Sequence, residues 1–134
     1  MDDPTELTPF ELVGGEAVVR AISKAFYDNM ETLEPALAQL HPLDADGRIT
    51  RETRDRFALF FIGWLGGPQE YMARHGHPRL RMRHARVPID TGMRDAWMRC
   101  IRLAMDAHPM PAEVRTFLDE RLAHVADFLR NVPE

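Results

Sequence analysis

The sequence predicts an all-α fold, and three observations support this. Apolar residues recur at intervals of three and four along four long segments, which is the period of an amphipathic helix. Gly and Pro residues separate these segments, and no segment alternates apolar and polar residues as a strand does. The 134 residues fit one domain, and a hydrophobic fraction of 45% suffices for a core. We expect a single domain over 1–134, with residues 1–8 as a loose leader.

The first half of the chain contains two of the four helices. A short turn at 10–13 ends at a pair of glycines, and a helix is expected from about 16 to 31. Residues 34–47 are expected to be irregular. A second helix is expected from about 50 to 65, with Thr50 as its N-cap and Gly-Gly-Pro at 66–68 as its end. Its broad aromatic face consists of Phe57, Phe60, Phe61, Trp64 and Leu65.

The second half contains the other two helices, after a long loop at 69–89. Asp90 or Thr91 caps a helix that extends to about residue 108, and Pro111 suits the first turn of a last helix that extends to about residue 131. Apolar stripes predict the buried faces. They are Met93, Trp97, Cys100, Ile101 and Ala104, and then Val114, Phe117, Leu118, Leu122, Val125 and Leu129.

Composition excludes several functional classes. A net charge of −4 makes the chain a poor nucleic-acid binder. Cys100 is the only cysteine, so no intrachain disulfide and no thiolate metal cluster can form. The acidic amino terminus does not resemble a signal peptide, and no apolar run approaches the ~20 residues of a membrane span. We therefore expect a cytoplasmic protein without a membrane partner. There is no phosphate-binding loop, dinucleotide fingerprint or Gly-x-Ser-x-Gly elbow.

The long loop is the strongest indication of a site, because a compact domain seldom tolerates about 20 irregular residues without a function. It contains three histidines and five arginines. His84 ends an arginine-rich turn and has Leu80 nearby, so it suits a metal within apolar surroundings. Arginine binds carboxylates through two parallel hydrogen bonds, which makes Arg83 and Arg56 candidates for holding haem propionates. These features suggest a haem pocket.

Aromatic residues with polar tips fit the same interpretation. Buried Tyr and Trp need a partner for their O–H or N–H groups, and in a haem pocket that partner is a diatomic ligand or a water molecule. Tyr27, Trp97 and His41 are the candidates, although His41 alone reads as a solvent-exposed loop residue. The aromatic face containing Phe60 and Phe61 would cover a flat cofactor.

Other interpretations of the same residues remain open at this stage. His84 alone fits an ordinary hydrogen-bonded histidine, the arginines fit a solvated loop, and the aromatic face fits a plain core. His75, His77 and His84 could bind zinc, but their spacing matches no recognised zinc motif. The loop has only Tyr71 for stacking on a nucleic acid. Cys100 lies among apolar residues and reads as an inert thiol.

Four motifs carry a resemblance to a known family. In chain order they are Phe26-Tyr27, Trp-Leu-Gly-Gly-Pro at 64–68, Gly-His-Pro-Arg-Leu-Arg-Met-Arg-His at 76–84, and Arg-Asp-Ala-Trp at 94–97. With these motifs, residues 9 to 130 resemble the group II truncated haemoglobins of bacteria. The resemblance implies a truncated globin fold, a two-over-two helical sandwich around haem b. It also implies His84 as the proximal iron ligand.

The same resemblance assigns the remaining site residues. Tyr27, His41 and Trp97 form the distal hydrogen-bonding set, and Thr53 and Phe57 face the distal side. Arg83 and Arg56 meet the propionates. Some relatives carry a tyrosine in place of His41, and a histidine's charge can change near neutral pH. Because Thr53 is small, we expect Tyr27 and Trp97 to dominate stabilisation of the bound ligand.

The expected function is reversible binding of dioxygen and other small ligands, namely carbon monoxide, nitric oxide or peroxide. Strong polar stabilisation favours redox chemistry, such as nitric oxide detoxification or peroxidase-like activity, over oxygen storage and transport. Such chemistry needs a separate reductase, because the chain contains no flavin or nicotinamide motif. The alternative is a globin-fold sensor or interaction domain without catalytic turnover.

Overall fold

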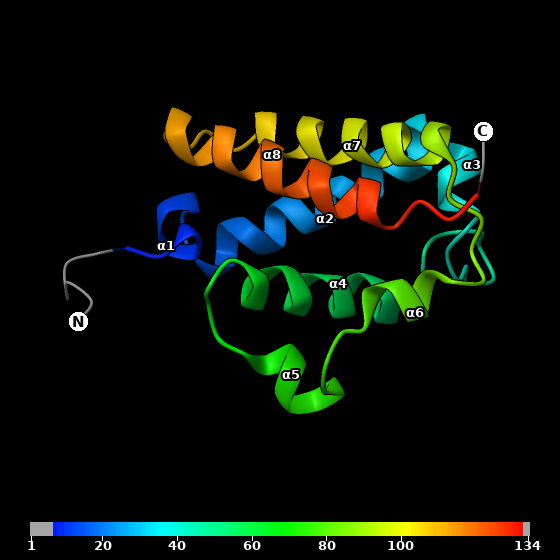
Figure 1. Ribbon diagram of the computed structural model, residues 1–134, viewed down its shortest axis with the longest axis horizontal. Helices are drawn as coiled ribbons and strands as arrows, with labels where there is room; N and C mark the ends of the chain where they lie inside the picture. Colours follow the sequence, from blue (N-terminus) through cyan, green and yellow to red (C-terminus); the bar gives the residue numbers. More distant parts are fainter. Residues whose placement is uncertain (1–6, 133–134) are drawn as a thin grey trace.

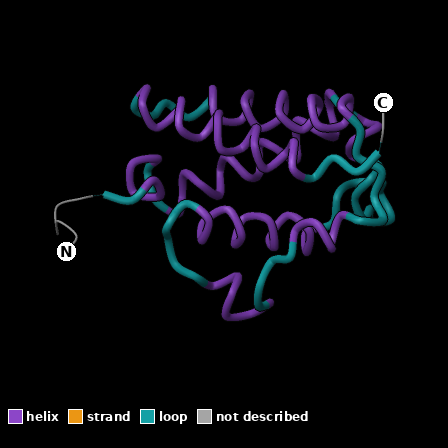
Figure 2. Tube along the Cα trace, viewed as in Figure 1, coloured by secondary structure: helices purple, strands orange, loops and turns teal. Residues whose placement is uncertain are grey.

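The computed structural model describes residues 7–132, so most of the expected leader at 1–8 lies outside the described residues. Over this range the chain forms eight helices joined by turns, with no strand, as the sequence predicts (Figures 1 and 2). Thr8 belongs to the ordered part, because its hydroxyl accepts a hydrogen bond from the Glu11 amide and caps the first helix. No helix in 7–132 is long and apolar enough to cross a bilayer.

Four long helices form two pairs. They are α2 (Glu16–Leu33), α4 (Arg51–Trp64), α7 (Thr91–Asp106) and α8 (Ala112–Phe128). α2 packs against both α4 and α7, and α7 packs against α8. Figure 1 shows α7 and α8 along the top of the molecule, with α4 below and α2 between. The pair formed by α2 and α4 is therefore stacked on the pair formed by α7 and α8.

The ends of two of these helices follow from caps that the sequence predicts. The Thr50 hydroxyl accepts a hydrogen bond from the Thr53 amide at 3.2 Å, and the Asp90 carboxylate accepts one from the Met93 amide at 2.8 Å. Pro111 occupies the N-cap position of α8 rather than its first turn. α8 ends at Phe128, three residues before the predicted end.

Four short helices complete the chain. They are α1 (Pro9–Val13), α3 (Pro35–Ala38), α5 (Glu70–His75) and α6 (Leu80–His84). The sequence predicts α1 as a single turn, but the expectation of irregular chain at 34–47 and 69–89 is wrong where α3, α5 and α6 occur. Helices of four to six residues are too short to show a helical period.

Special backbone geometry separates the two short helices α5 and α6. Gly76 has φ +73° and ends α5, and Arg79 has φ +46° and begins α6. Arg79 is the one non-glycine residue with positive φ in the described chain. The turn between them sends α6 to the right-hand end of the molecule in Figure 1, opposite α1.

The core lies between α2 and its two neighbours. Val19, Ile22, Phe26 and Met30 on α2 are fully buried, as are Cys100 and Ile101 on α7. One predicted core position is wrong: Phe117 on α8 is 42% exposed. Its neighbour Leu118 takes the buried position, and the Arg121 guanidinium lies 5.3 Å from the Phe117 ring.

Candidate functional site

Two adjoining cavities lie against α8: the larger between α8 and α4, and the smaller between α8, α7 and the segments around His41 and Val87. The larger has a volume of about 450 Å³ and the smaller about 240 Å³, sizes that suit a small-molecule site. Both are lined by His41, Pro42, Arg83, His84, Trp97, Val125 and Leu129. These shared residues make the two cavities parts of one pocket, which we call the central pocket.

The structure brings the predicted site residues together in this pocket, with one exception. Its walls include Tyr27, His41, Thr53, Arg56, Phe57, Phe60, Leu80, Arg83, His84 and Trp97. Phe61 does not line either cavity. Its side chain is 1% exposed and packs in the core between Phe57 and Trp64.

His84 closes α6, and its ring is set up to bind a metal through one nitrogen. Its Nδ1 lies 2.6 Å from the carbonyl oxygen of Leu80. Because a carbonyl oxygen only accepts, Nδ1 must donate, and the lone pair of the neutral ring is on Nε2. A hydrogen bond from the ring nitrogen that does not bind the metal is the usual way in which proteins orient a histidine ligand.

A zinc site at the histidines of the former loop is not supported. Within residues 7–132, no group of three His, Cys, Asp or Glu side chains is placed to hold a metal ion. The Nδ1 atom of His77 instead accepts a hydrogen bond from the Arg79 amide at 3.1 Å. The described residues therefore do not form the zinc site that the three histidines suggested.

Asn131, just after α8, holds the chain that follows His84. Its Nδ2 donates to the carbonyl oxygens of His84 at 3.0 Å and Val87 at 2.8 Å, and its Oδ1 accepts from the Ile89 amide at 2.9 Å. This clamp ties α6 to the end of α8. Sequence reasoning missed this clamp, because it joins segments that are more than 40 residues apart in the chain.

Tyr27 forms part of the opposite wall. Its side chain is 4% exposed, and its ring lies edge-on to Phe57 and His41, with centroids 5.6 and 5.8 Å away. Burial raises the pKa of the Tyr27 hydroxyl well above its usual range, although the charge of Arg54 opposes this. The hydroxyl thus stays protonated and available as a donor, and no residue in 7–132 accepts from it.

His41 offers the complementary group. Its Nδ1 lies 3.0 Å from the carbonyl oxygen of Leu37, so Nδ1 donates and Nε2 is an acceptor. Burial lowers the pKa of His41, and nearby His84 lowers it further, while backbone hydrogen bonds oppose the shift. The ring is neutral at neutral pH, so it does not supply the charge change there that the sequence suggested.

The third polar aromatic, Trp97, lies on α7 and lines both cavities. It is half-buried, packs edge-on to Phe26 at 5.1 Å, and has no hydrogen-bond partner among residues 7–132. Thr53 also lines the larger cavity, but its hydroxyl lies 2.8 Å from that of Thr50 and is engaged at the helix cap. Tyr27 and Trp97 therefore remain the two uncommitted donors on this wall.

Two arginines stand at the polar edge of the pocket, and one supplies a test of fit to haem. The Arg56 Nε atom is buried without a hydrogen-bond partner in the described chain, although its side chain also pairs with Glu52 at 3.4 Å. An unpaired buried donor is costly unless a ligand accepts from it. A propionate carboxylate would satisfy it, so the residues present fit a haem. Arg83 is exposed and lines both cavities.

Sequence reasoning missed several residues of the pocket wall. Tyr71 on α5 is 5% exposed, lies edge-on to Phe60 at 5.8 Å and lines the larger cavity. Val125 and Leu129, one turn apart on α8, line both cavities. Their stripe was recognised but was assigned to the core. The smaller cavity is further lined by Met93, which was likewise assigned to the core.

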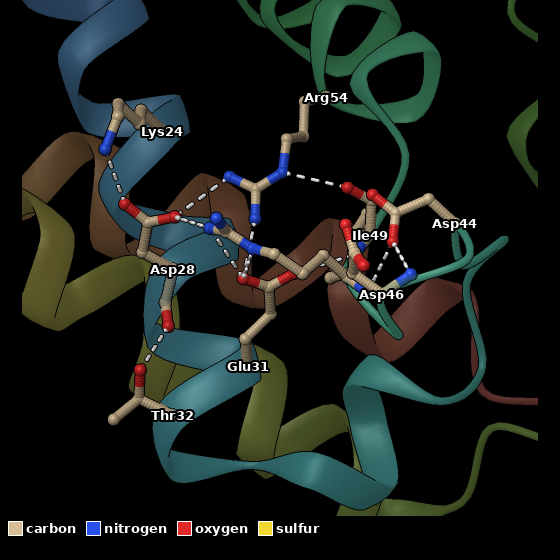
Figure 3. A network of polar contacts seen from close by, with 9 residues as sticks. Lys24, Asp28, Glu31, Thr32, Asp44, Asp46, Ile49 and Arg54 are labelled. Atoms are coloured by element: carbon tan, nitrogen blue, oxygen red, sulfur yellow. Dashed lines mark hydrogen bonds and ion pairs between the residues drawn. The ribbon is translucent and has the colours of Figure 1, made fainter.

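An ion-pair network supports the wall behind Tyr27 (Figure 3). Arg54 on α4 pairs with Asp28 at 3.0 Å and Glu31 at 2.9 Å, both on α2, and donates to the Ile49 carbonyl at 3.2 Å. The Arg54 guanidinium also lies 5.6 Å from the Tyr27 ring centroid. Arg54 thus joins α2, α4 and the preceding turn directly beneath Tyr27.

The carboxyls of this network are held in their charged form. Burial acts to raise the pKa of both Asp28 and Glu31, but hydrogen bonds and cationic neighbours outweigh it and lower both pKa values. For Asp28 these partners are Lys24 and Arg54; for Glu31 they include the Ile49 amide, which lies 2.7 Å from its carboxylate.

Comparison with known proteins gives consistent matches over nearly the whole chain. The bacterial-like globin family matches residues 8–131. The group 2 truncated hemoglobin YjbI of Bacillus subtilis is 35% identical over 126 residues, which cover 94% of this chain and 90% of that protein.

Solved structures agree in fold as well as in sequence. A cold-adapted truncated hemoglobin from the Antarctic marine bacterium Pseudoalteromonas haloplanktis is 39% identical, with a TM-score of 0.85 over 95% of this chain and 100% of that one. The group II 2-on-2 hemoglobin from the plant pathogen Agrobacterium tumefaciens is 35% identical, with a TM-score of 0.86 over 98% of each chain.

Replacing Arg54 with glutamine should lower the free energy of unfolding by about 1–3 kcal/mol, because it removes a charged hydrogen bond to Asp28 and an ion pair with Glu31. Since both carboxyl pKa values are lowered in the folded state, the loss should be full above about pH 5 and should shrink as the pH falls through the lowered values. Urea unfolding at several pH values measures it. Arg51→Gln, which affects only an exposed pair with Asp55, serves as the control. A loss that persists unchanged in acid would contradict the ion-pair account.

Replacing Asn131 with alanine should cost about 1 kcal/mol and loosen the segment after His84, because three hydrogen bonds are lost. Hydrogen exchange at the Ile89 amide and thermal unfolding measure this. Asn131→Asp is the matched control, since it keeps the acceptor for Ile89 but loses the donors to His84 and Val87. Equal exchange at Ile89 in the alanine and wild-type proteins would show that the clamp is unimportant.

Proposed function

The chain belongs to the bacterial-like globin family as a group II truncated haemoglobin that binds small ligands through a haem, and we propose that this haem is haem b and that His84 is its proximal ligand. The hydrogen bond from His84 Nδ1 to Leu80 is the observation that carries the proposal, because it leaves Nε2 as the ring nitrogen that is free to bind a metal on the pocket wall. The bound haem would supply an iron atom that takes dioxygen, carbon monoxide or nitric oxide reversibly.

The other residues of the pocket orient the cofactor and its ligand. Arg56 and Arg83 would hold the propionates, and the buried unpaired Nε of Arg56 supports its part in this. Apolar side chains from α4 and α8 would cover the two ring faces and exclude water. They include Phe57, Phe60, Val125 and Leu129.

Tyr27 and Trp97 would donate hydrogen bonds to the ligand on the distal side. Fixed donors stabilise partial negative charge without reorganisation, which favours dioxygen over carbon monoxide. His41, neutral and accepting at Nε2, would contribute by positioning a neighbouring donor or a water molecule rather than by donating itself.

Two donors on one small ligand favour slow release of dioxygen, so we propose redox chemistry rather than storage or transport. Combination of nitric oxide with dioxygen to give nitrate consumes one electron, and reduction of peroxide consumes two. Either reaction requires a separate reductase as partner. We further propose a cytoplasmic location, which suits the single thiol: Cys100 is fully buried, and its pKa is raised to about 11, mainly by burial.

A haem spectrum tests the central assignment. The purified wild type should show a Soret band that shifts when carbon monoxide is added to the dithionite-reduced protein. His84→Gly should lose this band or show an altered one, and added imidazole should restore it, because imidazole can occupy the vacated position. His108→Gly is the control, since His108 lies after α7 and does not line the pocket. A wild type that takes up no haemin would overturn the function and favour a sensor or interaction role without haem.

Replacing Trp97 with phenylalanine should speed dioxygen dissociation by about tenfold, because one hydrogen bond of about 1.4 kcal/mol to the ligand is lost. Tyr27→Phe should have an effect in the same direction. Stopped-flow displacement of dioxygen by carbon monoxide measures the rate. Trp64→Phe is the control, because Trp64 lines a separate cavity. An unchanged rate in Trp97→Phe would exclude it as a donor.

A further inference from the structure

The surface around α6 carries a positive charge that the rest of the molecule leaves unbalanced. Residues 71–89 contain five arginines and no Asp or Glu, although the whole chain has a net charge of −4. Arg79, Arg81, Arg83 and Arg86 in this segment are all exposed. We call these four residues and the exposed Met82 between them the α6 surface.

Ion pairing distinguishes the α6 surface from the rest of the chain. Twelve of the 17 Lys and Arg residues form an ion pair with a carboxylate. Among residues 7–132, five have none: Arg121 on α8 and the four arginines of the α6 surface. Most basic side chains of this protein are thus neutralised internally. On the α6 surface, Arg83 would serve a haem propionate, whereas Arg79, Arg81 and Arg86 are left for another molecule.

The chemistry of this surface fits a protein partner. Met82 is 62% exposed. Phe128 is 49% exposed, and the Arg81 guanidinium lies 4.9 Å from its ring centroid. Apolar groups surrounded by arginine are typical of protein interfaces, in which Met, aromatic and Arg residues are enriched. A patch of this small size suits a transient encounter.

The acidic charge of the rest of the chain favours some anionic partners of the α6 surface over others. An extended polyanion such as DNA, or the plane of an anionic bilayer, would also face the acidic remainder of the chain. Tyr71, the one aromatic ring of the segment 71–89, is buried, and the exposed Phe128 ring lies against the Arg81 guanidinium, so a base could stack on it only by displacing that arginine. A compact protein with a local acidic patch meets the α6 surface alone.

The place of the surface in the fold indicates what such a partner does. α6 carries His84, and Arg83 lines both cavities, so a protein docked here lies against the edge of the central pocket. We propose that the α6 surface is the docking site for an acidic one-electron donor protein. This rests on the proposed redox function, in which the donor's reduced flavin or iron–sulfur cluster loses one electron to the ferric iron, and no bond is formed or broken.

An acidic flavodoxin in its hydroquinone form is a suitable probe. The test uses the haem-loaded wild type, the variant R81E/R86E, and the control R20E/R121E, which has the same net charge change at residues outside the α6 surface. Two quantities are measured: the affinity for labelled flavodoxin by fluorescence anisotropy, and the rate of haem reduction by stopped flow. Both are followed from about 10 to about 200 mM salt, where screening changes most.

We expect affinity and reduction rate to fall by about tenfold in R81E/R86E at low salt, and to depend less on salt than in the wild type. R20E/R121E should stay within about twofold of the wild type, because steering charges act locally. Reduced lumiflavin, a small donor without an acidic protein surface, should reduce all three proteins at similar rates. Met82→Ser should weaken binding without changing its salt dependence.

Other results would overturn the proposal. Equal losses in both charge variants would show an effect of net charge only, and an unchanged affinity in R81E/R86E would show that flavodoxin does not use this surface. Binding to phosphatidylserine vesicles is measured as well. If R81E/R86E lost this binding but still bound flavodoxin, the α6 surface would be assigned to a bilayer. Failure of the proposed function would be recognised separately, because the protein would then show no haem spectrum or would not be reduced by lumiflavin. Fluorescence anisotropy measures docking of flavodoxin independently of both.

Discussion

The hydrogen bond between His84 Nδ1 and the Leu80 carbonyl is the interaction on which the pocket depends. It fixes which ring nitrogen is free and needs α6 to be a helix, since the two residues are one turn apart. α6 in turn needs the unusual turn at Gly76 and Arg79 to begin and the Asn131 clamp to hold its end. A few residues of irregular geometry therefore determine the chemistry of the whole site.

The walls of the pocket divide their polar roles by burial and by backbone contacts. Burial keeps the Tyr27 hydroxyl protonated, and so it donates, whereas the contact with Leu37 leaves His41 with an acceptor. Arg54 joins this arrangement to the ion-pair network of Figure 3, where it contacts the Tyr27 ring and two carboxylates at once. The position of the Tyr27 hydroxyl thus depends on charges that lie outside the pocket.

Sequence reasoning predicted the four long helices, the caps Thr50 and Asp90, and most of the pocket wall, because these depend on local spacing and on motifs. It missed α3, α5 and α6, which are too short to show a period. It placed Phe117 inside and Phe61 on the pocket wall, because a stripe shows which face is apolar but not what covers it. Asn131 and Tyr71 were missed because their contacts join segments that are far apart in the sequence.

The separation of α4 from α8 by the central pocket has a consequence for folding. A cavity with apolar walls between two helices costs packing energy, and a ligand that fills it repays that cost only in the folded state. Binding therefore adds to stability by mass action, in proportion to the logarithm of free ligand concentration. A higher concentration of free haem would therefore raise the fraction of this chain that is folded. The amount of folded protein in a cell would then rise and fall with haem synthesis.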